Sequence, residues 1–168
     1  MNPKEYQKRA LQTAQFPPEQ ALAYLTLGLC GEVAELIEKY QCQGQGAPLT
    51  EEDVIGELGD VCWYCAVLAN LFGIELGELG NEQWAAGSSD QLVIHAGLIA
   101  NKAKKTIRDG TPMNPEFVRE QIELILRAVA GEAELIGDST LAEVMRLNIE
   151  KLECRMARGV IAGSGDQR

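Results

Sequence analysis

The feature that most limits the fold of this chain is the spacing of its apolar residues. Across most of the 168 residues they recur every three or four positions, in long stretches that contain no proline. This spacing places apolar side chains on one face of an α-helix. No alternating run of β-branched residues is long enough to form a strand. The sequence therefore predicts an all-α fold, a helical bundle that forms a single domain over residues 1–168.

Proline, glycine and capping residues divide this pattern into separate helices. Pro17 and Pro18 end a short first helix, and Thr50 to Asp53 is typical of a capping box. The later helices are expected over residues 19–43, 50–72, 90–108, 115–136 and 138–157, with short or irregular helix after Gly73. Residues 158–168 are rich in glycine and are expected to form a flexible tail, which is either a cover over bound substrate or a frayed terminus.

A faint internal repeat relates two parts of the chain, each with the order helix, glycine turn, helix. The two parts are residues 19–73 and 95–137, and they align at an offset of 64, with Val54 opposite Val118 and Gly73 opposite Gly137. Where the first part carries Glu57 and Asp60, the second has Gln121 and Leu124. Either a hairpin was duplicated and one copy lost its charges, or two amphipathic hairpins are alike by chance.

The charge balance and the apolar runs exclude several classes of protein. Lys and Arg number 15 against 25 Asp and Glu, which gives a net charge of −10 and argues against a nucleic-acid partner. No apolar run reaches the roughly 18–20 residues of a membrane span, and no apolar signal core follows the N-terminus. The five cysteines are an odd number without an export signal, so we expect reduced thiols, a cytoplasmic location and no membrane contact.

Histidine and cysteine offer little catalytic chemistry here. His95 is the single histidine, so multi-histidine metal sites and Glu-x-x-His pairs are excluded. In its apolar setting it is interpreted as a packing or surface residue. Cys62 and Cys65 have no second pair and are interpreted as core residues. Carboxylates remain as the abundant reactive groups, with 25 Asp and Glu.

Two acidic pairs stand inside apolar stripes of neighbouring predicted helices. They are Glu32 with Glu35 and Glu57 with Asp60, and residues three apart share a helix face. The turns that precede and follow each pair are largely apolar, unlike an ordinary solvated stripe. At about 1.5 Å per residue from the intervening turn, an antiparallel hairpin brings the two pairs level.

Carboxylates that converge on such a seam raise one another's pKa or require a counter-cation. Oxygen ligands without histidine or thiolate favour Mg²⁺ or Mn²⁺. Lys39 lies one turn after Glu35 and is expected to pair with it. The alternative is that this pair belongs to the surface and that Glu57 borders the core.

The acidic motifs resemble a known signature. Residues 28–35, GLCGEVAE, and 56–64, GELGDVCWY, resemble the E-x-x-E and E-x-x-D motifs of the all-α nucleoside triphosphate pyrophosphohydrolases, which include MazG-like enzymes, dimeric dUTPases and phosphoribosyl-ATP pyrophosphohydrolase. The stretch from Asn148 to Gly165 is similar to the C-terminal motif of MazG-like and dimeric dUTPase members. The resemblance covers residues 20–72 and 140–168, and the long segment between them favours a two-copy form like the dimeric dUTPases.

This resemblance implies a MazG-like fold and a Mg²⁺-dependent enzyme, with Mn²⁺ as a substitute. The implied reaction is hydrolysis of a nucleoside or deoxynucleoside triphosphate at the α-phosphorus to the monophosphate and pyrophosphate, as nucleotide-pool house-cleaning. The implied metal ligands are Glu32, Glu35, Glu57 and Asp60. The implied catalytic carboxylates are Glu32, Glu35 and Glu38, of which Glu32 and Glu38 are the candidates for the base that accepts the proton of water.

The cations and aromatic groups that the substrate needs are expected elsewhere. The expected substrate-binding residues are Asn148, Lys151, Arg155, Arg158, Lys104 and Trp63. The first three fall on one face of the last helix, whose alternative role is a solvated surface. Lys104 belongs to a basic run that either reaches the phosphates or is only solvated. Trp63 and Tyr64 follow Asp60 closely, and one of them either stacks on the base or fills the core.

A second class of function fits the same pattern. It is a non-catalytic helical bundle that binds a nucleotide or another subunit through its apolar seams. In either class we expect a homodimer or homotetramer, because small helical hairpin proteins commonly bury leftover apolar faces against a copy of themselves.

Overall fold

The computed structural model describes residues 1–79 and 88–160, and these form helices and no strand. The elements are α1 (Pro3–Thr13), η1 (Pro18–Gln20), α2 (Ala21–Gly44), α3 (Glu51–Leu71), η2 (Leu76–Glu78), α4 (Ser89–Asp109), α5 (Pro115–Gly137) and α6 (Leu141–Ala157), where η marks a short 3₁₀ helix. The predicted all-α fold is confirmed. The predicted tail lies, from residue 161 on, outside the described residues.

Local capping chemistry explains where the helices begin and end. The capping box at Thr50 and Asp53 is present and starts α3. Asn114 caps α5 through its side chain, with Pro115 in the first turn. The last helix begins at Leu141, directly after the predicted start signal at residues 138–140. Asp138 adopts a left-handed conformation with φ 53° that ends α5, and Thr140 then caps α6.

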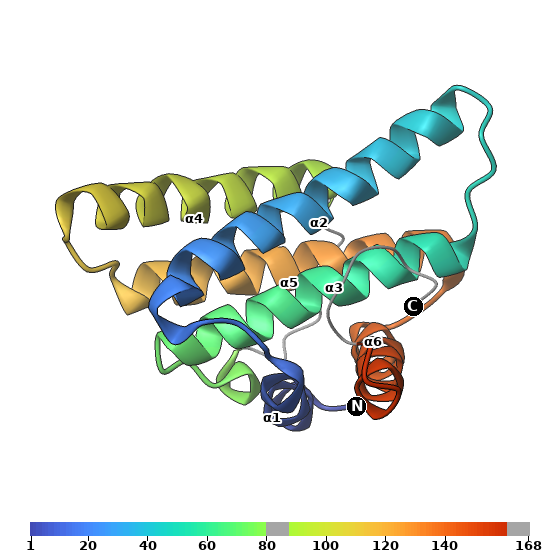
Figure 1. Cartoon of the computed structure of the whole chain (residues 1–168). Coiled ribbons are helices and arrows are strands. Elements are labelled where there is room, and N and C mark those ends of the chain that lie inside the picture. Colours follow the sequence, from blue (N-terminus) through green and yellow to red (C-terminus); the bar gives the residue numbers. More distant parts are fainter. Residues whose placement is uncertain (80–87, 161–168) are drawn as a thin grey trace.

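The four long helices α2 to α5 lie side by side as two antiparallel hairpins (Figure 1). The figure looks nearly along α1 and α6, which pack against α3 and against each other. Helix α3 touches α1, α2, α5 and α6 and is the central element. Its residues are buried on almost every side, Cys62, Trp63 and Cys65 among them. The predicted packing role of the two cysteines is confirmed.

The two hairpins follow the spacing of the sequence repeat. Helix α3 begins at Glu51 and α5 at Pro115, an offset of 64 (115 − 51). Their N-caps, Thr50 and Asn114, keep the same offset. The helical hairpin is therefore present twice in the bundle.

Two helical segments are long and apolar enough to cross a membrane when only length and composition are considered. They are Pro18–Gly44 and Glu51–Leu71. The apolar windows are 33% and 72% buried inside the protein, respectively. For α3, burial at the centre of the bundle accounts for its apolar composition.

Candidate carboxylate site

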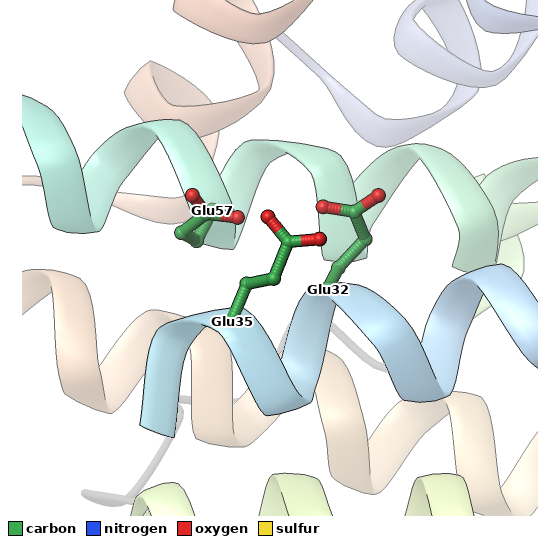
Figure 2. Close-up of side chains that lie close together, drawn as sticks. All are labelled: Glu32, Glu35 and Glu57. Carbon is green, nitrogen blue, oxygen red and sulfur yellow. The ribbon is translucent and has the colours of Figure 1, made fainter. Parts of the chain in front are cut away.

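Three glutamates of the α2–α3 hairpin point into one space. Glu32 and Glu35 leave α2 on the same side and are directed toward α3, from which Glu57 joins them (Figure 2). One carboxylate oxygen of each lies within 4.8 Å of the other two. The predicted convergence of these three acids is confirmed, and we call them the glutamate cluster.

The glutamate cluster runs from the surface into the protein: Glu35 is exposed, Glu32 is partly buried and Glu57 is buried. Burial raises the pKa of Glu32 to about 8; the charges of Asp60 and the other two glutamates add to this, and Lys151 opposes it. Burial also raises the pKa of Glu57, which is 4% exposed, and Lys39 opposes that shift. A carboxylate in such surroundings gains from a proton or from a nearby cation.

Lys39 joins the two helices of the hairpin. Its ammonium nitrogen lies 2.5 Å from Glu57 Oε1 and 3.4 Å from the carbonyl oxygen of Asp53, to which it donates a hydrogen bond. The sequence predicts Glu35 as the partner, one turn earlier on the same helix. In the structure the long side chain crosses to α3, where the buried carboxylate of Glu57 has need of a positive charge.

Asp60, the fourth predicted acid, lies beside the glutamate cluster and is held by α6. Lys151 Nζ donates to Asp60 Oδ1 and Oδ2 at 2.9 and 2.7 Å. Asn148 Nδ2 donates to Oδ1 at 2.7 Å. The charge of Asp60 is the largest charge effect on Glu32, yet Asp60 is not one of the three residues whose oxygens meet. The predicted group of four acids is thus three glutamates with an adjacent aspartate.

Close packing of α6 on α3 makes this contact possible. A Cβ atom on Gly59 would lie 2.8 Å from the Cβ of Asn148, so only glycine leaves room there. Asn148 is buried, and its Oδ1 accepts a hydrogen bond of 2.8 Å from the hydroxyl of Tyr6 on α1. Three helices therefore meet around one amide.

The remaining predicted residues of the acidic and C-terminal motifs occupy different surroundings. Glu38 is exposed, one turn beyond Glu35, and is not part of the glutamate cluster. Arg155 is buried one turn after Lys151, on the same face of α6. Arg158 is exposed at the C-cap of α6.

Lys104 lies on a helix that packs on the other side of α2. It is exposed on α4 and donates a hydrogen bond of 2.9 Å to Asn101. Helix α4 contacts α2 near Cys30, whose thiol is hydrogen-bonded to the carbonyl of Ala96. Cys30 and Glu32 are about 200° apart around α2, and Figure 2 shows α4 on the side away from the carboxylates. The structure does not bring Lys104 to the glutamate cluster.

Trp63 belongs to the core. Its side chain is buried, and the indole nitrogen donates a hydrogen bond of 2.8 Å to the hydroxyl of Thr13 on α1. This is the arrangement that the core-filling interpretation expects.

Tyr64, the other aromatic residue considered for base stacking, lies against Tyr24, which with Phe16 the sequence analysis did not single out. Tyr24, 40% exposed, has its ring centroid 5.0 Å from that of Phe16 and 6.1 Å from that of Tyr64. The Tyr64 ring fills the place where a side chain on Gly28 would be. Tyr24, Gly28 and Glu32 follow at four-residue intervals along one face of α2, and this spacing is the signal that predicts the arrangement.

The glutamate cluster suits a small divalent cation. Mg²⁺ binds oxygens at about 2.0–2.1 Å, so ligands on opposite sides of the ion lie about 4 Å apart. The three glutamate oxygens lie within 4.8 Å of one another, so they would have to move closer together to bind one such ion. The donors are all carboxylate oxygens, which favour Mg²⁺ or Mn²⁺ over softer metals.

Comparison with known proteins adds one relative. The chain is similar to the Gene 37 protein of Mycobacterium phage L5, with 41% identity over 81 residues that cover 46% of this chain and 70% of the phage protein. No family model matches the chain, and no solved structure does. The name of this relative states no activity.

Proposed function

We propose that this chain, which belongs to the family of the Gene 37 protein of Mycobacterium phage L5, hydrolyses nucleoside triphosphates to the monophosphate and pyrophosphate with a divalent cation. One observation carries the proposal: oxygens of Glu32, Glu35 and Glu57 lie within 4.8 Å of one another. The resemblance of both acidic motifs to the all-α nucleoside triphosphate pyrophosphohydrolases supports the same activity.

The proposal divides the carboxylates by their surroundings. Glu32, Glu35 and Glu57 hold the cation, together with Asp60 as an adjacent fourth ligand. Bound Mg²⁺ or Mn²⁺ would neutralise phosphate charge and lower the pKa of an attached water. The pKa of Glu32 is about 8 in the absence of metal, and a bound cation would favour release of its proton to solvent. The ionised Glu32 then accepts the proton of the attacking water. Glu38 is the second candidate for this base, and its exposure makes it the weaker one.

The groups around the glutamate cluster fit a nucleotide. Lys151 reaches this space from α6, and its ammonium group can bind phosphate oxygens. Arg155 lies one turn further on the same face and Arg158 follows at the C-cap. Tyr24 offers an exposed ring on which a nucleobase can stack.

Release of pyrophosphate tests the proposal. Purified protein is incubated with each common nucleoside and deoxynucleoside triphosphate, with and without MgCl₂, and the products are separated. We expect monophosphate and pyrophosphate in equal amounts, formed only with the metal. Glu35→Gln and Asp60→Asn should each lower turnover by about 100-fold or more while the helical circular dichroism is kept.

A matched control separates the site from the general acidity of the chain. Glu134→Gln removes an exposed carboxylate from α5 and should leave turnover unchanged. If no triphosphate is cleaved, and nucleotide still binds with the metal, the chain is a non-catalytic nucleotide-binding module instead.

The proposal also extends to the setting of the protein. We place it in the cytoplasm, where its substrates are found, with nucleoside triphosphates rather than nucleic acid or membrane as partners. Exposed apolar side chains such as Leu27, Ile94 and Leu98 favour self-association as a homodimer or homotetramer.

A further inference from the structure

Tyr6 is separated from the acidic motifs in sequence but lies two hydrogen bonds away from the carboxylate site. It is completely buried on α1. Its hydroxyl donates to Asn148 Oδ1 at 2.8 Å, and the amide nitrogen of the same side chain donates to Asp60 Oδ1 at 2.7 Å. We propose that Tyr6 is a positioning residue of this site, which fixes the Asn148 amide and through it Asp60 for the divalent cation. This inference rests on the proposed function.

The donor role of Tyr6 follows from its surroundings. Burial, with the negative potential of Cys62 and Asp60, raises the pKa of the Tyr6 hydroxyl well above its ordinary value, so the hydroxyl keeps its proton. An amide presents one acceptor oxygen and one donor nitrogen. With the oxygen facing the Tyr6 hydroxyl, the nitrogen faces the carboxylate of Asp60.

One further contact holds α1 against α6, and another lets α6 pack closely on α3. Arg9 on α1 forms a two-pronged ion pair with Glu153 on α6, at 2.8 and 2.6 Å. Gly59 on α3 leaves the space that the Asn148 side chain occupies. The amide is thus enclosed by α1, α3 and α6, and its position depends on all three helices.

Fixing Asp60 matters because Asp60 has competing partners. Lys151 donates to both Asp60 oxygens. Without another partner, the Asp60 carboxylate would move together with the long lysine side chain. The hydrogen bond from Asn148 ties Oδ1 to a rigid buried amide. Groups that orient a metal ligand in this way commonly change metal affinity by 10- to 100-fold when they are removed.

Calorimetric titration with MgCl₂ alone tests the inference without reference to turnover. Tyr6→Phe keeps the ring and removes the hydroxyl, and we expect the dissociation constant for Mg²⁺ to rise about tenfold. The matched control is Thr13→Val, which removes a different buried hydrogen bond between α1 and α3, the one from Trp63. It should change the dissociation constant by less than about twofold.

A double-mutant cycle shows whether Tyr6 acts through Asn148. Asn148→Ser alone should weaken Mg²⁺ binding at least as much as Tyr6→Phe, and the double variant should be no weaker than Asn148→Ser. In ¹H–¹⁵N spectra of the metal-free protein, the side-chain NH₂ signals of Asn148 should shift in Tyr6→Phe and stay in place in Thr13→Val.

The outcomes separate this inference from the proposed function. If Tyr6→Phe binds Mg²⁺ like the wild type, or if its effect adds fully to that of Asn148→Ser, the positioning role is overturned. If Thr13→Val weakens binding equally, Tyr6 only stabilises the fold, and the role is also overturned. If the wild type binds no Mg²⁺, the proposed function is contradicted, and the positioning role of Tyr6 is overturned as well because it depends on that function.

Discussion

Glu32 has a strongly raised pKa, because its charged form is disfavoured both by burial and by neighbouring negative charges. Its pKa of about 8 arises first from burial and then from three neighbouring carboxylates. Sequence reasoning predicted this effect because the turns around each acidic pair are apolar. It could not predict the ion pair between Lys39 and Glu57, because this pair joins two helices and depends on how deeply Glu57 is buried after they pack.

In the absence of metal, the titration of Glu32 makes the stability of the protein depend on pH. The pKa of Glu32 is near 4.3 in the unfolded chain and about 8 in the folded protein. The folded state therefore holds the proton more tightly, so this contribution to stability is complete below about pH 4 and is lost as the pH rises to about 8. After allowance for solvent screening the loss is on the order of 2 kcal/mol.

Thermal unfolding with EDTA at pH 5 and at pH 8.5 measures this effect. The fall in Tm between the two pH values should be smaller in Glu32→Gln than in the wild type, by roughly 5 °C. Glu134→Gln, which changes an exposed glutamate, serves as the control. Equal falls in Glu32→Gln and the wild type would contradict the assignment.

At the scale of the elements, the sequence predicted the helices better than their contacts. Prolines, the capping box at Thr50 and the apolar spacing marked most helix boundaries closely, because capping and periodicity are local. The predicted start signal of α6 at residues 138–140 contains both Asp138, which ends α5 in a left-handed conformation, and the cap Thr140. The buried position of Asn148 between α1 and α3 was not predicted. Gly59 leaves space for this side chain, and that function is visible only once α6 is packed against α3.

Gly59→Ala tests how closely α6 must approach α3. The new methyl group would lie 2.8 Å from the Asn148 Cβ, so α6 has to shift. We expect a loss of about 1–3 kcal/mol in the free energy of unfolding, together with weaker Mg²⁺ binding.

Gly56→Ala is the matched control, one turn earlier on the same helix, where a Cβ would meet nothing within 4 Å. It should stabilise the protein by about 0.5–1 kcal/mol, because alanine favours the helix. Urea unfolding of both variants measures these changes. Similar stability of the two variants would show that the contact between Gly59 and Asn148 is not tight.

At the scale of the whole molecule, two helical hairpins share one bundle, and only the first has acidic residues at the four positions of the candidate site. The positions offset by 64 from the four acids are Ala96, Ile99, Gln121 and Leu124. Ala96 and Ile99 are buried in the core, and the side chain of Gln121 is hydrogen-bonded to His95. The second hairpin therefore supports the first by packing, and one glutamate cluster per chain is expected to bind metal.

The central claim is that Glu32, Glu35 and Glu57 form a divalent-cation site, and calorimetric titration with MgCl₂ or MnCl₂ at pH 8 tests it most directly. We predict saturable binding to one cluster per chain in the wild type. In Glu57→Gln, checked for folding by circular dichroism, the affinity should fall at least about tenfold. Glu134→Gln should bind like the wild type. The absence of saturable binding in the wild type, or equal affinity in Glu57→Gln, would contradict the claim.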